Sequence, residues 1–383
     1  MSIRKLLNES LISVYKNKEL NEGAEDHPDA KTKCVTPQAL ADDMTKELNR
    51  INTAAKDRTK RGVKDIIYHK KQIQSVINKE GGLDVDKFKT LITTSPKVIF
   101  DKNPKMEKSD VGASQYTVNT GLPAISGIIY DEGEKQFKHI NTCPGAGACQ
   151  LVCYARKGFY GMNDGKILKL IRRLNLLWND PEEYYNMIMD ELEPLAVKLK
   201  RQGRRSGSVD QLVIRWNDAG DFFSDKYFEI AQRVTKNLIE DGYKIKSYAY
   251  TKQAKFVNLG SDEFIMNFSK GSAPKEIAQV DIEKVKYSDI VPKELFKKVF
   301  KWKGPHVVKG EDGLPVFDEG GKETLRQLVA KAYNVSVDRL KYQFELPSEE
   351  GEKFQYDVIV LPTGDTDIGA QRMDVQKTFL LIH

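Results

Sequence analysis

Apolar residues near the N-terminus recur every three or four positions, which is typical of amphipathic helices. This spacing predicts a helix around Leu40–Ile51 and a second one over Val63–Ile77. The polar stretch Glu19–Lys33, which contains a glycine and a proline, is expected to be a loop. We therefore expect residues 1–110 to form a helical extension that packs on the rest of the protein or on a partner.

From about residue 112, short apolar runs alternate with helical patterns. Extended segments are expected at Gly121–Tyr130, Gln211–Trp216, Lys244–Tyr250 and Phe264–Phe268. Helices are expected at Ile167–Trp178, Pro181–Arg201 and Asp225–Ile239. Strands and helices that alternate at this spacing predict βαβ units and a parallel sheet.

Residues 300–350 interrupt this alternation with several glycines, and only one helix, Glu323–Tyr333, is expected there. Two further strands are predicted at Asp357–Leu361 and Thr378–Ile382. About six strands are too few for a closed barrel of eight. We therefore predict an α/β fold with an incomplete (β/α) barrel or an open sheet. Residues 111–299 would form the core, 300–350 an insertion, and 351–383 the strands that complete the core.

The 61 basic and 55 acidic residues are mixed along the chain, and the net charge is +6. Such a balance permits nucleic-acid binding without requiring it. No segment approaches the ~20 apolar residues of a membrane span, and the N-terminus lacks the features of a signal peptide. We expect a cytoplasmic protein without a membrane partner.

Three of the four cysteines lie within eleven residues and form the pattern C-x5-C-x3-C. Cys143, Cys149 and Cys153 stand on a loop rich in glycine and alanine, where small residues let the backbone approach a bound group closely. Three thiolates on a [4Fe–4S] cluster leave one iron open for a substrate or cofactor. We expect the three sulfurs to converge within about 7 Å of one another.

Two other interpretations of the cysteines remain open. A zinc site would need a fourth ligand, which Cys34 or a histidine such as His139 would have to supply. Alternatively, the three cysteines are buried without a ligand role.

Three segments carry a resemblance to a known family: TCPGAGACQLVCYARKG, RWNDAGDFFS and SYAYTK. Over about residues 112–270 the chain resembles the gene product 88 family of bacteriophage proteins. That family is in turn similar to the radical S-adenosylmethionine (SAM) enzymes, although their cysteine spacing, C-x3-C-x2-C, is shorter. The resemblance implies a phage protein of the host cytoplasm, with a nucleic acid or a host protein as a plausible target.

The segment after the strand Gln211–Trp216 resembles the glycine-containing acidic turn with which radical SAM enzymes bind the amino group of SAM. This resemblance implies Asp218 and Asp221 as acidic ligands, with Gly220 forming the turn. By position at strand ends, candidate cofactor-binding residues are Asn217, Asp218, Gly220, Asp221, Tyr250, Lys252 and Asn267. Tyr248 and Tyr250 are expected to share one face of their strand.

Other patterns exclude or weaken several functions. The chain has no phosphate-binding loop, no dinucleotide-binding glycine motif and no serine-hydrolase elbow. The acids of the C-terminal loop, such as Asp367 and Asp374, could bind a ligand at the strand ends, but they are expected to be solvated. Basic runs at 56–61 and 198–205 would suit nucleic-acid phosphates, but solvated charges are the favoured interpretation.

We therefore expect an iron–sulfur protein that acts as a radical SAM-type enzyme on an unknown substrate. The alternative is a non-catalytic phage protein, in which an iron–sulfur or zinc site stabilises a loop and the surface binds nucleic acid or a protein partner.

Overall fold

The computed structural model describes residues 30–53, 70–102, 107, 110, 115–153, 155, 165–206, 210–291, 293–299, 304–309, 315–361 and 366–381. The expected helix Val63–Ile77 lies partly outside them, and its described part is α3 (Lys70–Val76). The basic run at 56–61 lies outside the described residues altogether.

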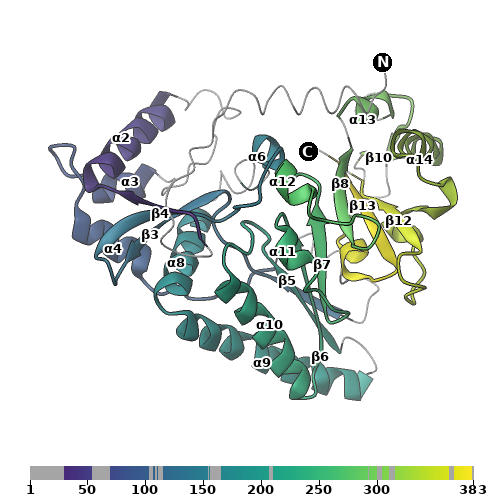
Figure 1. The fold of residues 1–383 in the computed structure, drawn as a ribbon, viewed down its shortest axis with the longest axis horizontal. Coiled ribbons are helices and arrows are strands. Elements are labelled where there is room, and N and C mark those ends of the chain that lie inside the picture. The colour runs from purple at the N-terminus through teal and green to yellow at the C-terminus, as the bar shows by residue number, and fades with distance from the viewer. Residues whose placement is uncertain are drawn as a thin grey trace.

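Eight parallel strands form the central sheet (Figure 1). From one side to the other they are β11 (Leu340–Tyr342), β12 (Tyr356–Ile359), β13 (Val375–Leu381), β8 (Tyr287–Val291), β7 (Phe264–Ser269), β6 (Lys244–Thr251), β5 (Gln211–Trp216) and β2 (Gln115–Asn119). Every neighbouring pair is parallel. All eight strands therefore end at the same edge, which is called the carboxyl edge below. Among the described strands, no ladder joins β2 to β11.

The order of the strands shows how the chain builds this sheet. Strands β2, β5, β6, β7 and β8 lie side by side in chain order, whereas β13, β12 and β11 follow in reverse order. The predicted α/β fold with a parallel sheet is confirmed, but the expected number of six strands is wrong. The sequence pattern missed β2, β8 and β11, because two of them carry several polar residues and the third has only three residues.

The expected extended segment Gly121–Tyr130 belongs elsewhere. Its second half is β3 (Ser126–Asp131), which joins β4 (Gln136–Asn141) and β1 (Thr32–Val35) in a separate antiparallel sheet. Helices α2 (Pro37–Thr53), α3 and α4 (Val85–Thr93) lie with this sheet at one end of the molecule (Figure 1). Leu40, Phe88 and Ile128 share one apolar cluster with residues of α8 (Lys166–Asn179).

The segment after β8 completes the other end of the central sheet. It contains α13 (Lys293–Val299), the hairpin of β9 (Val307–Lys309) and β10 (Pro315–Phe317), and α14 (Glu319–Tyr333). Leu325 of α14 and Leu295 of α13 are buried in one cluster with Leu340 of β11 and Phe379 of β13. The predicted interrupting segment thus contributes both a strand and a covering helix to this sheet.

Helices α9 (Pro181–Ser206) and α10 (Asp225–Glu240) cover one face of β5 and β6 (Figure 1). The α10 helix is capped by Ser224, whose side chain accepts a hydrogen bond from the Tyr227 backbone N–H. It ends before Gly242, which adopts the left-handed conformation with φ 77°.

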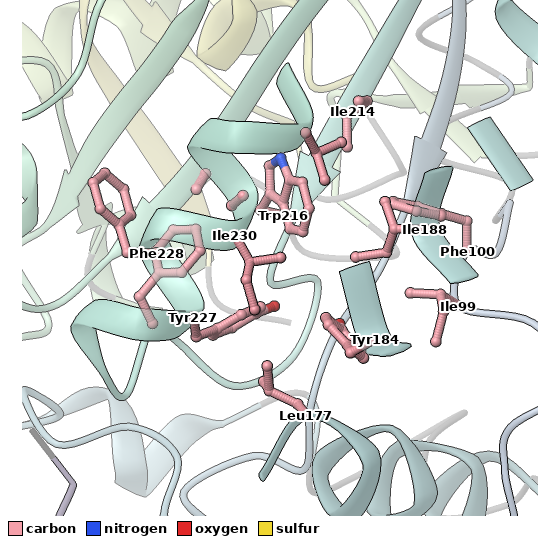
Figure 2. Packing of buried hydrophobic residues seen from close by; sticks show 14 of the residues in the cluster. Ile99, Phe100, Leu177, Tyr184, Ile188, Ile214, Trp216, Tyr227, Phe228 and Ile230 are labelled. Atoms are coloured by element: carbon pink, nitrogen blue, oxygen red, sulfur yellow. The ribbon is translucent and has the colours of Figure 1, made fainter. Parts of the chain in front are cut away.

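Trp216, the last residue of β5, lies at the centre of this helix-covered face. Its ring packs edge-on against Tyr227 and Phe100, with centroid distances of 6.4 and 6.0 Å. Figure 2 shows it between Ile230 of α10 and Ile188 of α9. Its side chain is fully buried, and its indole N–H donates to Ser247 Oγ at 3.3 Å.

The opposite face of the sheet is covered by the C-terminal part of the chain. Val213, Tyr248 and Ile265 from β5, β6 and β7 pack there with Ala370 of η6 (Ile368–Gln371). Tyr250 packs against the same cluster, which confirms that Tyr248 and Tyr250 share a face. In the described part of the chain, no helix is long and apolar enough to cross a membrane.

The position of Trp216 leads to a first prediction. Trp216→Ala should lower the free energy of unfolding by about 3–5 kcal/mol, because a large side chain is removed from a packed core. Leu259→Ala is the control, since Leu259 is 52% exposed and its truncation should change stability by less than about 0.5 kcal/mol. Urea unfolding of both variants measures the difference, and equal effects would contradict the assigned core.

Candidate metal centre at the carboxyl edge

The cysteine loop lies against the segment that follows β7. The carbonyl oxygen of Gly271 accepts hydrogen bonds from the backbone N–H groups of Gly147 and Cys149, at 3.0 and 3.2 Å. In return, the N–H of Ala273 donates to the Gly145 carbonyl at 2.8 Å. The short helix α6 (Cys149–Val152) therefore lies beside α12 (Pro274–Ile277) (Figure 1).

The same loop also contacts the segments that follow β5 and β6. The Asp221 backbone N–H donates to the Thr142 carbonyl at 2.8 Å. A side chain at Gly145 would collide with the backbone carbonyl of Lys252, so this position requires glycine. The segments that follow the three neighbouring strands β5, β6 and β7 thus all contact the same cysteine loop.

The thiols of the loop lie close enough to one another to interact electrostatically. Cys143 is buried, and burial raises the pKa of its thiol to about 12, with Lys252 opposing the shift and Asp221 and Cys149 adding to it. Burial also raises the pKa of Cys149, which is half-buried; Lys252 opposes that shift, and Cys153 adds to it. Without a metal, the Cys143 and Cys149 thiols are therefore neutral at pH 7.

Lys252 is the cation shared by the three cysteines. Burial by itself would lower its pKa, but Asp221 and the sulfurs of Cys149, Cys143 and Cys153 act in the opposite direction, and the net pKa is raised. Lys252 is therefore charged at neutral pH. A cation at this position would offset the negative charge of a cluster held by three thiolates.

Asp221 is fully buried and joins two of the segments around the loop. Its carboxylate accepts hydrogen bonds from the backbone N–H groups of Phe222 and Lys252, both at 2.8 Å. Burial raises the pKa of the carboxyl, and Lys252 opposes this shift. We assign Asp221 a positioning role, because both oxygens are used within the protein; its part in cofactor binding remains a prediction.

Ile125 has a backbone conformation that a β-branched residue seldom adopts. Its φ is 70°, in the left-handed region. In this conformation its N–H donates to Cys143 Sγ at 3.3 Å, and its carbonyl accepts from the Thr142 N–H at 3.0 Å. Strained residues of this kind cluster at functional sites. The sequence carries no signal that singles out Ile125.

The turn after β5 contains two left-handed residues. Asn217 has φ 58° and Gly220 has φ 79°. Asn217 is buried, and its Oδ1 accepts a hydrogen bond from the Tyr227 hydroxyl at 2.9 Å. At Gly220 an added Cβ would lie 3.0 Å from Leu122 Cβ, so the turn also needs the small residue for close packing.

Asp218 takes part in a buried ionic network on the face opposite the helices. Arg215 Nη1 lies 2.8 Å from Asp367 Oδ2 and 3.3 Å from Asp218 Oδ1. The Tyr248 hydroxyl donates to Asp367 at 3.0 Å, and the Arg215 guanidinium lies 5.7 Å from the centre of the Tyr250 ring. Asp367 is 1% exposed, so the expectation of a solvated acid is wrong for this residue.

Asp374 and Asn267 are also buried residues with partners inside the protein. Asp374 is fully buried and paired with Arg372 at 2.6 Å, so it is not a solvated acid either. Asn267 Nδ2 donates to the carbonyls of Ala249 and Ala370, at 3.2 and 3.1 Å. Of the predicted cofactor residues, only Gly220, Tyr250 and Lys252 are partly exposed.

The donor chemistry of the loop fits an iron–sulfur cluster or a zinc ion, because it combines three thiols, backbone N–H groups directed at Cys143 and Cys149, and a nearby cation. Within the residues that the structure describes, no three His, Cys, Asp or Glu side chains are already arranged as ligands of one metal ion. Cys34 lies exposed on β1, paired with Lys138 of β4.

These features define an α/β protein in which a three-cysteine loop is held at the carboxyl edge of a parallel sheet. A family model described as Gene product 88 matches residues 97–334, more than half of the chain, so the chain belongs to this phage-type family. The match includes the cysteine loop and strands β2 and β5–β8, and it ends before β11. Comparisons with curated proteins and with solved structures gave no match.

The backbone of Ile125 leads to a second prediction. Ile125→Gly should be more stable than Ile125→Ala by about 1 kcal/mol, because only glycine avoids the clash of Cβ in the left-handed conformation. At Ile129, which is buried in β3, the order should reverse. Urea unfolding of the four variants compares the two positions. A more stable alanine at 125 would show that the residue does not have a positive φ.

Proposed function

We propose that Cys143, Cys149 and Cys153 hold a [4Fe–4S] cluster at the carboxyl edge of the sheet. The observation that carries this proposal is the attachment of the three-cysteine loop to the segments that follow β5, β6 and β7. The hydrogen bond from the strained Ile125 N–H to Cys143 Sγ supports it, since such a bond favours the ionised sulfur that a metal requires.

The enzymatic form of this proposal is a radical SAM-type reaction. Strands β2 and β5–β8 lie side by side in chain order, as in part of a (β/α) barrel, where ligands bind at the carboxyl edge. Cys143, Cys149 and Cys153 would hold the cluster, and a reduced cluster bound there would supply the electron that the cleavage of SAM requires.

The residues around the cysteine loop would have different roles in this reaction. Lys252 is charged and partly exposed, so it would bind the carboxylate of SAM. Tyr250 would cover the site beside it. Asp221 would hold the segments after β5 and β6 together, and the paired Asp218 would keep the turn in place.

The metal content of the protein tests the proposed [4Fe–4S] cluster. Protein purified without oxygen should contain about four irons and four acid-labile sulfides per chain, as the [4Fe–4S] formula requires. Cys143→Ala, Cys149→Ala and Cys153→Ala should each lose most of this iron. Cys34→Ala is the matched control and should retain it, because Cys34 is exposed on β1.

Two other outcomes would overturn the assignment of a [4Fe–4S] cluster. One zinc per chain without acid-labile sulfide would favour the alternative, a non-catalytic protein in which zinc stabilises the cysteine loop and the surface binds nucleic acid or a protein partner. No metal in wild-type protein after anaerobic reconstitution with iron and sulfide would refute a metal centre.

The proposed radical SAM-type reaction is tested by measuring the binding of SAM to cluster-loaded protein by calorimetry. Lys252→Met should weaken binding by about tenfold or more, since a charged hydrogen bond contributes about 1.5–3 kcal/mol. Lys255→Met is the control, because Lys255 pairs with the exposed Asp225 at 2.7 Å. Wild-type protein with a full cluster but no affinity for SAM would refute the radical reaction and leave the cluster assignment intact.

A further inference from the structure

A groove lined by helices α3, α4 and α8 lies at the end of the molecule opposite α14 (Figure 1). Its volume is about 510 Å³, within the range of ligand-binding sites in proteins. The apolar side chains of Val76 and Leu91 line it together with the exposed residues Ser75, Thr90 and Thr94, which carry hydroxyls. None of the lining residues belongs to the cysteine loop, so the groove is independent of the metal centre proposed above.

Arg172 of α8 also lines this groove and is half-buried. Its Nε donates a hydrogen bond to the Leu91 carbonyl of α4 at 2.9 Å, which fixes the guanidinium beside the groove. Within the described part of the chain, no carboxylate forms an ion pair with this guanidinium. Burial lowers the pKa of Arg172, but an arginine remains charged at neutral pH.

The lack of a carboxylate partner distinguishes Arg172 from the other buried and half-buried arginines that the structure describes. The half-buried ones each pair with a carboxylate: Arg50, Arg233, Arg326 and Arg339. The buried ones do so as well: Arg173, Arg215 and Arg372. A partly desolvated charge without a counter-charge is costly, so Arg172 is suited to an anionic group from outside the chain.

We propose that the groove binds an acidic peptide segment of a partner protein, with a glutamate or aspartate side chain of that segment on Arg172. The two Nη groups can donate parallel hydrogen bonds to a carboxylate, while Nε stays bonded to Leu91. Val76 and Leu91 would pack against an apolar side chain of the peptide, and the Thr90 hydroxyl would bond its backbone.

The exposure of the groove favours a peptide over a small molecule. Most of the lining residues are exposed, so a small molecule would stay largely in contact with water. A peptide segment is longer than the groove and also contacts the surface on either side of it. The additional contacts offset the cost of ordering the segment.

The charges of the groove favour a peptide over a nucleic acid. Asp84 and Asp86 line the groove together with Lys87 and Arg172, so that acidic and basic residues balance. A nucleic acid carries a negative charge at every phosphate and would also face the two aspartates. A single carboxylate placed on Arg172 avoids this repulsion.

Peptide binding to the full chain, measured by fluorescence anisotropy at low salt, tests the proposal. The probe is a labelled eight-residue peptide in which the sequence Glu-Leu-Ser-Gly occurs twice, and its neutral counterpart has glutamine in place of glutamate. Wild-type protein should bind the acidic peptide about tenfold more tightly, since the counterpart cannot form the ion pair. Arg172→Met should abolish this preference. Arg201→Met is the control, because Arg201 is an exposed arginine of α9 outside the groove, and it should keep the preference.

A second pair of variants tests the groove without changing Arg172. Thr90 is exposed, so its replacement should leave the fold intact. Thr90→Glu should weaken the binding of the acidic peptide, and Thr90→Lys should strengthen it, because each places a charge in the groove. Thr324→Glu is the matched control, since Thr324 is an exposed threonine of α14.

Several outcomes would overturn the proposal. Wild-type protein that does not bind the acidic peptide, or binds both peptides equally, would refute the site. A preference that persists in Arg172→Met and in Thr90→Glu would place the binding elsewhere. Tighter binding of a twelve-residue oligodeoxythymidine than of the acidic peptide, lost in Arg172→Met, would overturn the proposal in favour of a nucleic-acid site.

Discussion

The carbonyl oxygen of Gly271 accepts hydrogen bonds from both Gly147 and Cys149, and this shared acceptor holds the cysteine loop against the central sheet. Its effect depends on the parallel arrangement of the strands. Because β5, β6 and β7 all end at one edge, the segments that follow them meet the same loop. The loop is thereby attached at three places, and its cysteines stand next to Lys252 and Asp221.

The two faces of the sheet are built in different ways. Parallel sheets are usually apolar on both faces, and the face under α9 and α10 follows this rule around Trp216. The opposite face carries the ionic network of Arg215, Asp218 and Asp367 next to Tyr248. Two carboxylates around one guanidinium keep these buried charges paired, which is what makes their burial tolerable.

The C-terminal segment completes this polar face, although the family match ends at residue 334. Asp367 and Ala370 cover β5–β7 from the far end of the chain. Lys286, just before β8, donates to the carbonyls of Gly369 and Arg372, at 3.2 and 2.6 Å, and thereby fastens this cover. The residues that follow the matched region therefore supply the nearer of the two carboxylates that pair with its buried Arg215.

The sequence alone determined the local features of this protein. Periodicity predicted Gln211–Trp216 with both ends correct, and the spacing of the cysteines marked the loop that lies at the carboxyl edge. Only the tertiary structure decided the strand order, the burial of Asp221 and Asp367, and the left-handed backbone of Ile125. Periodicity reflects neighbours a few residues apart, whereas the bond between Tyr248 and Asp367 joins residues 119 positions apart, which no local pattern encodes.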